Sequence, residues 1–351
     1  MPQGNRQFIS HIMKNKIGLK LFATIIISGF ILLSFIFTGC GNEEKNPGIT
    51  KDSTDAWNAQ KLALLFENDE WVPPDTSALP HDAQGDLIRY GRNLVAATGE
   101  YFGPAGKINH FANGMNCQNC HLDAGTKLFA NSYSAVFSIY PKFRPRSGTV
   151  EHLEKRINDC MERSMNGKKI DSLSNEMRAM VAYINWVGKD VKKGVSPKGA
   201  SVVDLPYLDR AADPEKGKVA FEKNCVKCHG SDGQGMLNAD STFQYPPLWG
   251  PRSYNTAAGL YRLSRFAGYI KSNMPNLTSS HDKPTLSDEE AWDIAAFVNS
   301  MPRPEKKFKG DWPDISKKPV DHPFGPFSDS YPETQHKFGP FKEIADVHKK
   351  K

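Results

Sequence analysis

Apolar residues recur at helical spacing in several separate stretches of the chain. The first stretch runs from Asp86 to Thr98, and later stretches open at Leu173 and Leu286. Their apolar positions are Leu87, Tyr90, Leu94 and Val95, then Met180, Val181, Ile184 and Val187, and finally Ala291, Ile294, Ala295 and Val298. An apolar face with this spacing is typical of helices that pack on a core. The pattern therefore predicts a helical fold.

The signals that begin these helices occur twice in the chain. Ser287 and Glu290 form a capping box, and Ser174 can cap a helix in the same way without the reciprocal glutamate. Asp213-Pro214 is a further helix start, because proline is favoured at the first helical position. An opening helix and a closing helix, used twice, indicate two tandem helical domains joined by a linker at 194–206.

Each predicted domain contains two cysteines two residues apart, followed directly by histidine. The motifs are Cys117, Cys120 and His121 in the first domain, and Cys225, Cys228 and His229 in the second. This spacing attaches c-type haem, with the thiols on the vinyl groups and the histidine on the iron. A zinc site would need further Cys or His ligands nearby, and neither copy has them. We predict an all-α fold with two covalently bound haem c groups, in tandem cytochrome c domains at 73–200 and 201–304, each with its own core.

The chain begins with a basic and then an apolar segment. Residues 21–37 are continuously apolar or small and follow four basic residues, so residues 1–39 are predicted to be a secretory signal. Small residues before Cys40 resemble a bacterial lipoprotein cleavage box, with Phe37 in place of the usual leucine. An uncleaved membrane helix is the alternative. We expect a lipoprotein anchored through Cys40 at the periplasmic side of the bacterial cell envelope, with residues 40–72 as a polar linker.

The formal net charge of +6 comes largely from that first segment. Removing Arg6, Lys14, Lys16 and Lys20 leaves +6 − 4 = +2. So small a charge gives no argument for a nucleic-acid partner.

The repeat also indicates the sixth iron ligand of the second domain. Met274 lies 45 residues after His229 and 13 before Ser287, where a cytochrome c places its distal methionine. Met236 is only seven residues past His229, and Met301 follows the closing helix. Met274 is therefore the predicted ligand, and methionine ligation raises the haem potential.

In the first domain the same offset falls on Cys160 and Met161, and the repeat alone does not decide between them. With Cys40 lipidated and four cysteines bound to haem, Cys160 is the one thiol left. A buried inert cysteine and an intermolecular disulfide are alternatives to a role as ligand.

Polar and basic residues surround Cys160. If residues 151–165 are helical, Arg156, Cys160 and Ser164 share one face, and Arg146 lies in the loop ahead. A guanidinium near a thiol favours the thiolate, and two arginines with a hydroxyl suit an oxyanion. Alternatively, Arg156 pairs with Asp159 or with a haem propionate, and the spacing favours neither interpretation.

From about Trp71 to Pro304 the sequence resembles the dihaem thiosulfate dehydrogenases, oxidoreductases that also act as tetrathionate reductases. The clearest stretches are Asn113-Gly114, Cys117 to Gly125, Leu153 to Gly167, Pro246 to Asn255 and Leu286 to Pro304. The resemblance implies Cys160 as the distal ligand opposite His121. It also implies substrate-binding positions at Arg146, Arg156 and Ser164. Two positions depart from the family: Met161 replaces a residue that is often aromatic, and Asn273 stands where some members have lysine.

The resemblance implies oxidation of two thiosulfate ions to tetrathionate, with electrons passed to an external acceptor such as another cytochrome. A non-enzymatic electron-transfer cytochrome is the alternative. A dihaem peroxidase is disfavoured because His152 is eight residues before Cys160, about 12 Å along a helix. The tail at 305–351 is rich in Pro, Lys and aromatic residues, and we predict an extended strap over the domains.

Overall fold

The computed structural model describes residues 71–349 of the chain. These residues fall within one compact unit, Ala56–Lys351. The predicted signal peptide, the lipidation site at Cys40 and nearly all of the 40–72 linker lie outside the described residues. Over residues 71–349, no helix is long and apolar enough to cross a membrane.

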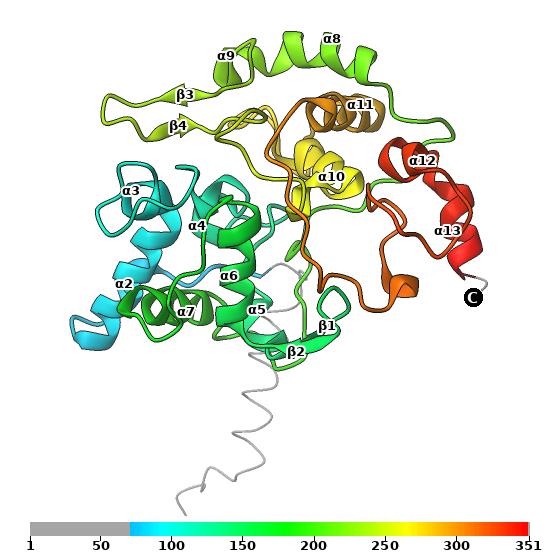
Figure 1. The fold of residues 1–351 in the computed structure, drawn as a ribbon. Helices are drawn as coiled ribbons and strands as arrows, with labels where there is room; N and C mark the ends of the chain where they lie inside the picture. The colour runs from blue at the N-terminus through cyan, green and yellow to red at the C-terminus, as the bar shows by residue number, and fades with distance from the viewer. Residues whose placement is uncertain (1–70, 350–351) are drawn as a thin grey trace, which may run out of the picture. The chain divides into compact units, whose positions relative to one another are not determined.

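Helices dominate the described part of the chain, and its strands form two short hairpins (Figure 1). The first half contains η1 (Thr76–Ala78), α2 (Ala83–Ala96), α3 (Thr98–Phe102), η2 (Cys117–Asn119), α4 (Leu122–Gly125), α5 (Val136–Ile139), β1 (Lys142–Arg144), β2 (Thr149–Glu151), α6 (Leu153–Arg163) and α7 (Asn175–Val187). The second half contains α8 (Pro214–Asn224), α9 (Val226–His229), β3 (Met236–Leu237), β4 (Phe243–Tyr245), η3 (Gly259–Tyr261), α10 (Leu263–Asn273) and α11 (Asp288–Ser300). Both hairpins are antiparallel, with Phe143 opposite Val150 in one and Met236 opposite Tyr245 in the other. The predicted all-α class is confirmed.

The predicted helix starts are present. The hydroxyl of Ser174 accepts a hydrogen bond of 3.1 Å from the backbone N–H of Met177 and caps α7. At α11 the capping box is complete, because Glu290 N–H donates to the Ser287 hydroxyl and Ser287 N–H donates to the Glu290 carboxylate. Asp213 caps α8, with Pro214 at its first position. The opening and closing helices of the repeat therefore lie where the sequence predicts them.

The two helix pairs cross in the same way. α2 packs on α7, and α8 packs on α11. At each crossing a glycine permits close contact between the backbones. A Cβ atom on Gly91 would lie 1.9 Å from the carbonyl oxygen of Ala179, and one on Gly217 would lie 1.9 Å from that of Asp293. Any side chain at these two positions would push the helices apart. The two domains therefore share this helix packing as well as the repeated sequence motifs.

The expectation of separate cores is only partly met. One buried cluster contains Leu94 and Tyr183, and a second contains Phe221 and Trp292. However, Tyr254, Ala258 and Tyr261 from the second half belong to the first cluster, whereas Ala130 from the first half belongs to the second. Apolar residues are shared because the two halves pack directly on one another. The boundaries 73–200 and 201–304 stay predictions.

Polar side chains also join the halves. The amide of Asn113 donates to the carbonyl of Ser253 at 3.0 Å, and the backbone N–H of Asn255 donates to the carbonyl of Arg163 at 3.1 Å. Two of the stretches that carry the family resemblance, at Asn113-Gly114 and Pro246 to Asn255, thus meet at this junction.

The tail differs from its prediction. It contains η4 (Ile315–Lys317), α12 (Glu333–Phe338) and α13 (Phe341–Lys349), so the prediction of an extended conformation is wrong for 333–349. Short helices of this kind are stabilised by packing rather than by local propensity. Phe341 belongs to the second buried cluster, and Ile344 is completely buried.

Candidate active site

The first CxxCH motif and the predicted distal residues meet in one cavity of about 300 Å³. The motif begins in η2 and continues past its end to His121, and α6 carries Arg156 and Cys160. The lining includes Cys117, Cys120, His121, Tyr133, Tyr140, Arg156, Cys160 and Ser164. α6 begins at Leu153 rather than at Glu151, which ends β2, and Ser164 is its C-cap. The face that joins Arg156, Cys160 and Ser164 is therefore present as predicted.

Both motif histidines are oriented by a backbone carbonyl. Nδ1 of His121 lies 2.6 Å from the carbonyl oxygen of Asn131, and Nδ1 of His229 lies 2.9 Å from that of Pro246. The carbonyl accepts a hydrogen bond from Nδ1–H, which leaves Nε2 with its lone pair free for a metal. Burial lowers the pKa of His229, which also favours the neutral ligand form. These residues fit the predicted haem groups. No sequence signal marks Asn131 or Pro246, because the interacting atom of each belongs to the backbone.

The cysteines fall into two classes. Burial raises the pKa of Cys117, Cys120 and Cys225 to about 12, which favours the neutral thiol before haem is attached. Cys160 is different: burial opposes the thiolate, but the Arg156 guanidinium and, after it, the nearby His121 side chain lower its pKa to about 7. Cys160 therefore has thiolate character that Cys117, Cys120 and Cys225 lack.

Arg156 contacts the thiol directly. Its Nη1 donates a hydrogen bond to Sγ of Cys160 at 3.0 Å. Asp159, the alternative partner considered from the sequence, instead pairs with Lys155 at 2.5 Å. Arg156 is thus available to the cavity rather than used in an ion pair on its own helix.

Met161 and Cys160 have different environments. The side chain of Met161 is fully buried in the first core cluster and does not line the cavity, whereas Cys160 does. Consecutive residues on a helix point about 100° apart, so only one of the two faces the CxxCH motif. Cys160 is the residue on the cavity side, and its ligation of iron stays a prediction.

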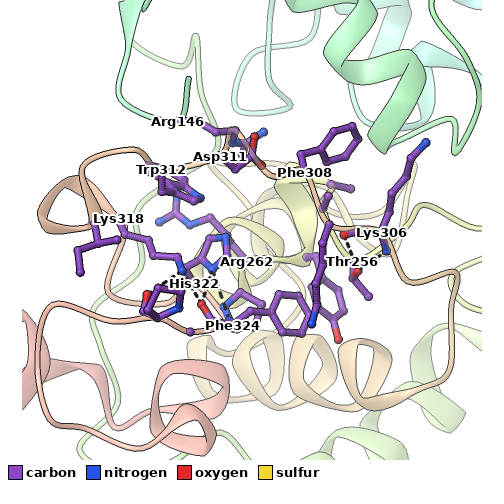
Figure 2. A pocket seen from close by; sticks show the side chains of 18 of the residues that line it. Arg146, Thr256, Arg262, Lys306, Phe308, Asp311, Trp312, Lys318, His322 and Phe324 are labelled. Atoms are coloured by element: carbon purple, nitrogen blue, oxygen red, sulfur yellow. Dashed lines mark hydrogen bonds between the residues drawn. The ribbon is translucent and has the colours of Figure 1, made fainter. Parts of the chain in front are cut away.

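Arg146 does not line the Cys160 cavity. It lines a different cavity, together with Trp312 and Lys318 (Figure 2). Burial and the nearby charges of Arg163 and Arg156 lower the pKa of Arg146 to about 10. Cys160, Arg156 and Ser164 therefore line one cavity as predicted. Arg146, the other residue predicted for the catalytic site, does not.

The second CxxCH motif has its own cavity, lined by Cys225, Cys228, His229 and Met274. The competing methionines Met236 and Met301 do not line this cavity, and Met236 is 43% exposed. Cys120 from the first motif lines this cavity as well as the first. The two cavities therefore adjoin at Cys120, an arrangement that the spacing of the motifs did not indicate.

Comparison with known protein families identifies both domains. Residues 107–192 match the SoxA/TsdA cytochrome c domain, and residues 214–302 match cytochrome c. The predicted tandem cytochrome c domains are confirmed, and with them two covalently bound haem c groups.

Comparison with individual proteins gives a consistent result. A thiosulfate dehydrogenase of Psychrobacter arcticus is 37% identical over 244 residues, which cover 69% of this chain and 71% of the relative. A thiosulfate dehydrogenase of Allochromatium vinosum is 38% identical over 235 residues, covering 66% of this chain and 83% of the relative. The solved structure of the thiosulfate dehydrogenase TsdBA from Marichromatium purpuratum superposes with a TM-score of 0.65 at 30% identity, covering 77% of this chain and 55% of that one.

Proposed function

Because the chain belongs to the thiosulfate dehydrogenase family, we propose that it oxidises two thiosulfate ions to tetrathionate in the cavity lined by Cys160. The overall reaction is 2 S₂O₃²⁻ → S₄O₆²⁻ + 2 e⁻. The observation that carries this proposal is the contact of 3.0 Å between the Arg156 guanidinium and the Cys160 sulfur. It joins a nucleophile and an anion-binding cation in one cavity.

The cation answers the main electrostatic difficulty of the reaction. Two unit charges about 4 Å apart repel by about 1 kcal/mol in water, and two dianions contain four such pairs. Near a protein the repulsion is several times larger, so substrate binding requires positive charge. Arg156 supplies that charge beside Cys160, and the Ser164 hydroxyl adds a hydrogen-bond donor on the same face.

The Cys160 sulfur then acts as the nucleophile. The Cys160 thiolate sulfur and the outer sulfur of one thiosulfate form an S–S bond and release two electrons, which gives Cys160 Sγ–S–SO₃⁻, with both sulfur atoms retained. The outer sulfur of a second thiosulfate attacks the sulfur bound to Cys160, so tetrathionate forms and the thiolate is regenerated. When bound, the haem groups supply one-electron acceptors for the two electrons released. His121 and Cys160 would hold the iron of the first haem, and His229 and Met274 that of the second.

The electrons leave through the second domain in this proposal. The adjoining cavities at Cys120 support a short path between the domains. Tyr269, on the helix that precedes Met274, donates a hydrogen bond of 2.7 Å to the carbonyl of Asn119 and helps to fix their separation. The final acceptor is an external protein, for which a further cytochrome is suited.

We also propose that the chain is exported and anchored by a lipid on Cys40, on the sequence evidence of residues 1–40. The segment at 305–332 would act as a strap over both domains. Two ion pairs support that role, from Arg163 to Asp311 at 2.6 Å and from Arg262 to Asp321 at 2.5 Å.

The test is an assay of the purified holoprotein with thiosulfate and an artificial electron acceptor. Tetrathionate should form in a 1:2 ratio to thiosulfate consumed, and Cys160→Ala should abolish it while both haem groups stay attached. Reduction of the haem groups by an added donor without thiosulfate oxidation would instead favour the non-enzymatic electron-transfer cytochrome.

A further inference from the structure

A further cavity, of about 280 Å³ and separate from the two cavities at the CxxCH motifs, lies between the tail and the rest of the described chain (Figure 2). Residues 306–326 of the tail form most of its wall, and Thr256 to Arg262 and Arg146 complete it. It shares no lining residue with the Cys160 cavity. It is therefore a separate feature that the proposed reaction does not use.

Positive charge dominates this cavity. Its cationic lining residues are Arg146, Arg262, Lys306, Lys307, Lys309 and Lys318. The carboxylates in and beside the cavity are already paired, since Asp311 binds Arg163 and Asp321 binds Arg262. His322 is neutral at neutral pH, because burial and the nearby Lys318 lower its pKa to about 4. An excess of cationic charge is left without a counter-ion in the described residues.

Lys318 carries the clearest part of that excess. The residue is 7% exposed, and its Nζ donates hydrogen bonds to the carbonyl oxygens of Phe324 at 2.6 Å and Pro326 at 2.9 Å. The Phe327 ring lies 5.4 Å away, and no carboxylate within residues 71–349 reaches ion-pair distance. A buried ammonium is unfavourable unless an opposite charge is near, so Lys318 lacks the partner that its burial calls for.

Two other donor groups that line this cavity lack a hydrogen-bond acceptor. The indole N–H of Trp312 is buried and has no hydrogen-bond partner. The Arg146 guanidinium lies 5.8 Å from the Trp312 ring and makes no ion pair with a described residue. Indole and guanidinium groups are donors only, so neither can satisfy the other. A ligand that satisfies them must bring negative charge and several acceptor oxygens.

We propose that this cavity binds one small divalent oxyanion of the chemical class shared by thiosulfate and sulfate. Lys318 and Trp312 come from the tail and Arg146 from the body of the protein, so the bound anion would join the tail to the body. The site is distinct from the Cys160 cavity, and its occupancy does not depend on thiosulfate oxidation there.

The experiment is isothermal titration calorimetry of the holoprotein carrying Arg156→Ala, which weakens anion binding at the Cys160 cavity. Sulfate and thiosulfate are titrated separately at constant ionic strength. One equivalent of sulfate should bind, and thiosulfate should compete for it. A higher affinity for thiosulfate would identify the substrate as the natural occupant, and equal affinities would identify a general divalent-oxyanion site. The absence of saturable binding of either anion would overturn the proposal.

Three variants in the same background sharpen this test. Lys318→Met should weaken binding by at least tenfold, whereas Lys317→Met, which removes the same charge from an exposed neighbour outside the cavity, should leave it unchanged. Trp312→Phe keeps an aromatic ring but removes the unpartnered N–H together with the five-membered ring of the indole. It should weaken binding, and its melting temperature in anion-free buffer measures any loss of packing separately. Unchanged affinity in both Lys318→Met and Trp312→Phe would sink the assignment, and thiosulfate turnover in Cys160→Ala tests the reaction separately.

Discussion

Replacing Arg156 by alanine should reduce thiosulfate oxidation far more than it reduces stability. The change removes a charge-assisted hydrogen bond of 3.0 Å to Cys160 and the positive charge expected to bind the dianion. Such a hydrogen bond contributes about 1.5 to 3 kcal/mol, and each 1.4 kcal/mol is a factor of ten. The value of kcat/KM should therefore fall by about tenfold to 100-fold.

The assay is steady-state oxidation of thiosulfate with an artificial acceptor, together with haem content and melting temperature. Arg178→Ala is the matched control, because Arg178 is exposed on α7 and its side chain makes no hydrogen bond or ion pair within the described residues. The control should keep its kcat/KM within about twofold, as expected for an exposed side chain. Equal kcat/KM for Arg156→Ala and the unmodified protein would refute a substrate-binding role. A parallel loss of melting temperature and activity would make Arg156 a structural residue.

Five other substitutions have definite expected outcomes. Cys160→Ala should abolish tetrathionate formation and the visible spectrum of thiolate ligation, whereas Met161→Leu should retain both, since it conserves volume in an apolar core; the reverse pattern would make Met161 the ligand. Asp311→Ala leaves the buried Arg163 guanidinium unpaired, so denaturant unfolding should show a loss of about 3 kcal/mol. Asp329 is buried, which opposes its ionisation, but hydrogen bonds from His348 and His336 lower its pKa below 3.8. A carboxyl group whose pKa is lowered in the folded state stabilises the fold above about pH 4, and this stabilisation is lost as the pH falls. Asp329→Asn should therefore reduce the drop in melting temperature at acid pH. Cys40→Ser should remove a lipid-sized increment from the intact mass and leave two haem groups, and an unchanged increment would place the lipid elsewhere.

The candidate site was predictable from sequence where covalent chemistry or helical spacing fixes the residues. CxxCH needs no tertiary information, and the separation of Arg156, Cys160 and Ser164 places them on one helical face. The choice between Cys160 and Met161 was different, because the repeat allowed either residue. It depends on which side of α6 faces η2, and that side is set by the packing of Met161 into the first core cluster.

The position of Arg146 could not be predicted for a related reason. It follows β1 in a loop whose course depends on the tail, since the backbone N–H of Trp312 donates to the Arg146 carbonyl at 2.6 Å. Contacts between residues so far apart in sequence leave no periodic signal. The same limit explains the error in the tail, where Phe341 and Ile344 gain helical structure from burial rather than from a strong local pattern.

The junction between the halves links these observations to electron transfer. A thiosulfate dehydrogenase must pass two electrons singly from its substrate site to an acceptor, so the separation of its haem groups must not vary. Two kinds of contact restrict that separation near Cys120. One is the packing of apolar residues from each half into the core cluster of the other, and the second is the hydrogen bond from Tyr269 to Asn119. Tyr269→Phe removes only the hydroxyl, so it should slow reduction of the second haem by thiosulfate while leaving reduction of the first unchanged in a stopped-flow measurement. Equal rates in both proteins would assign the spacing to the apolar contacts alone.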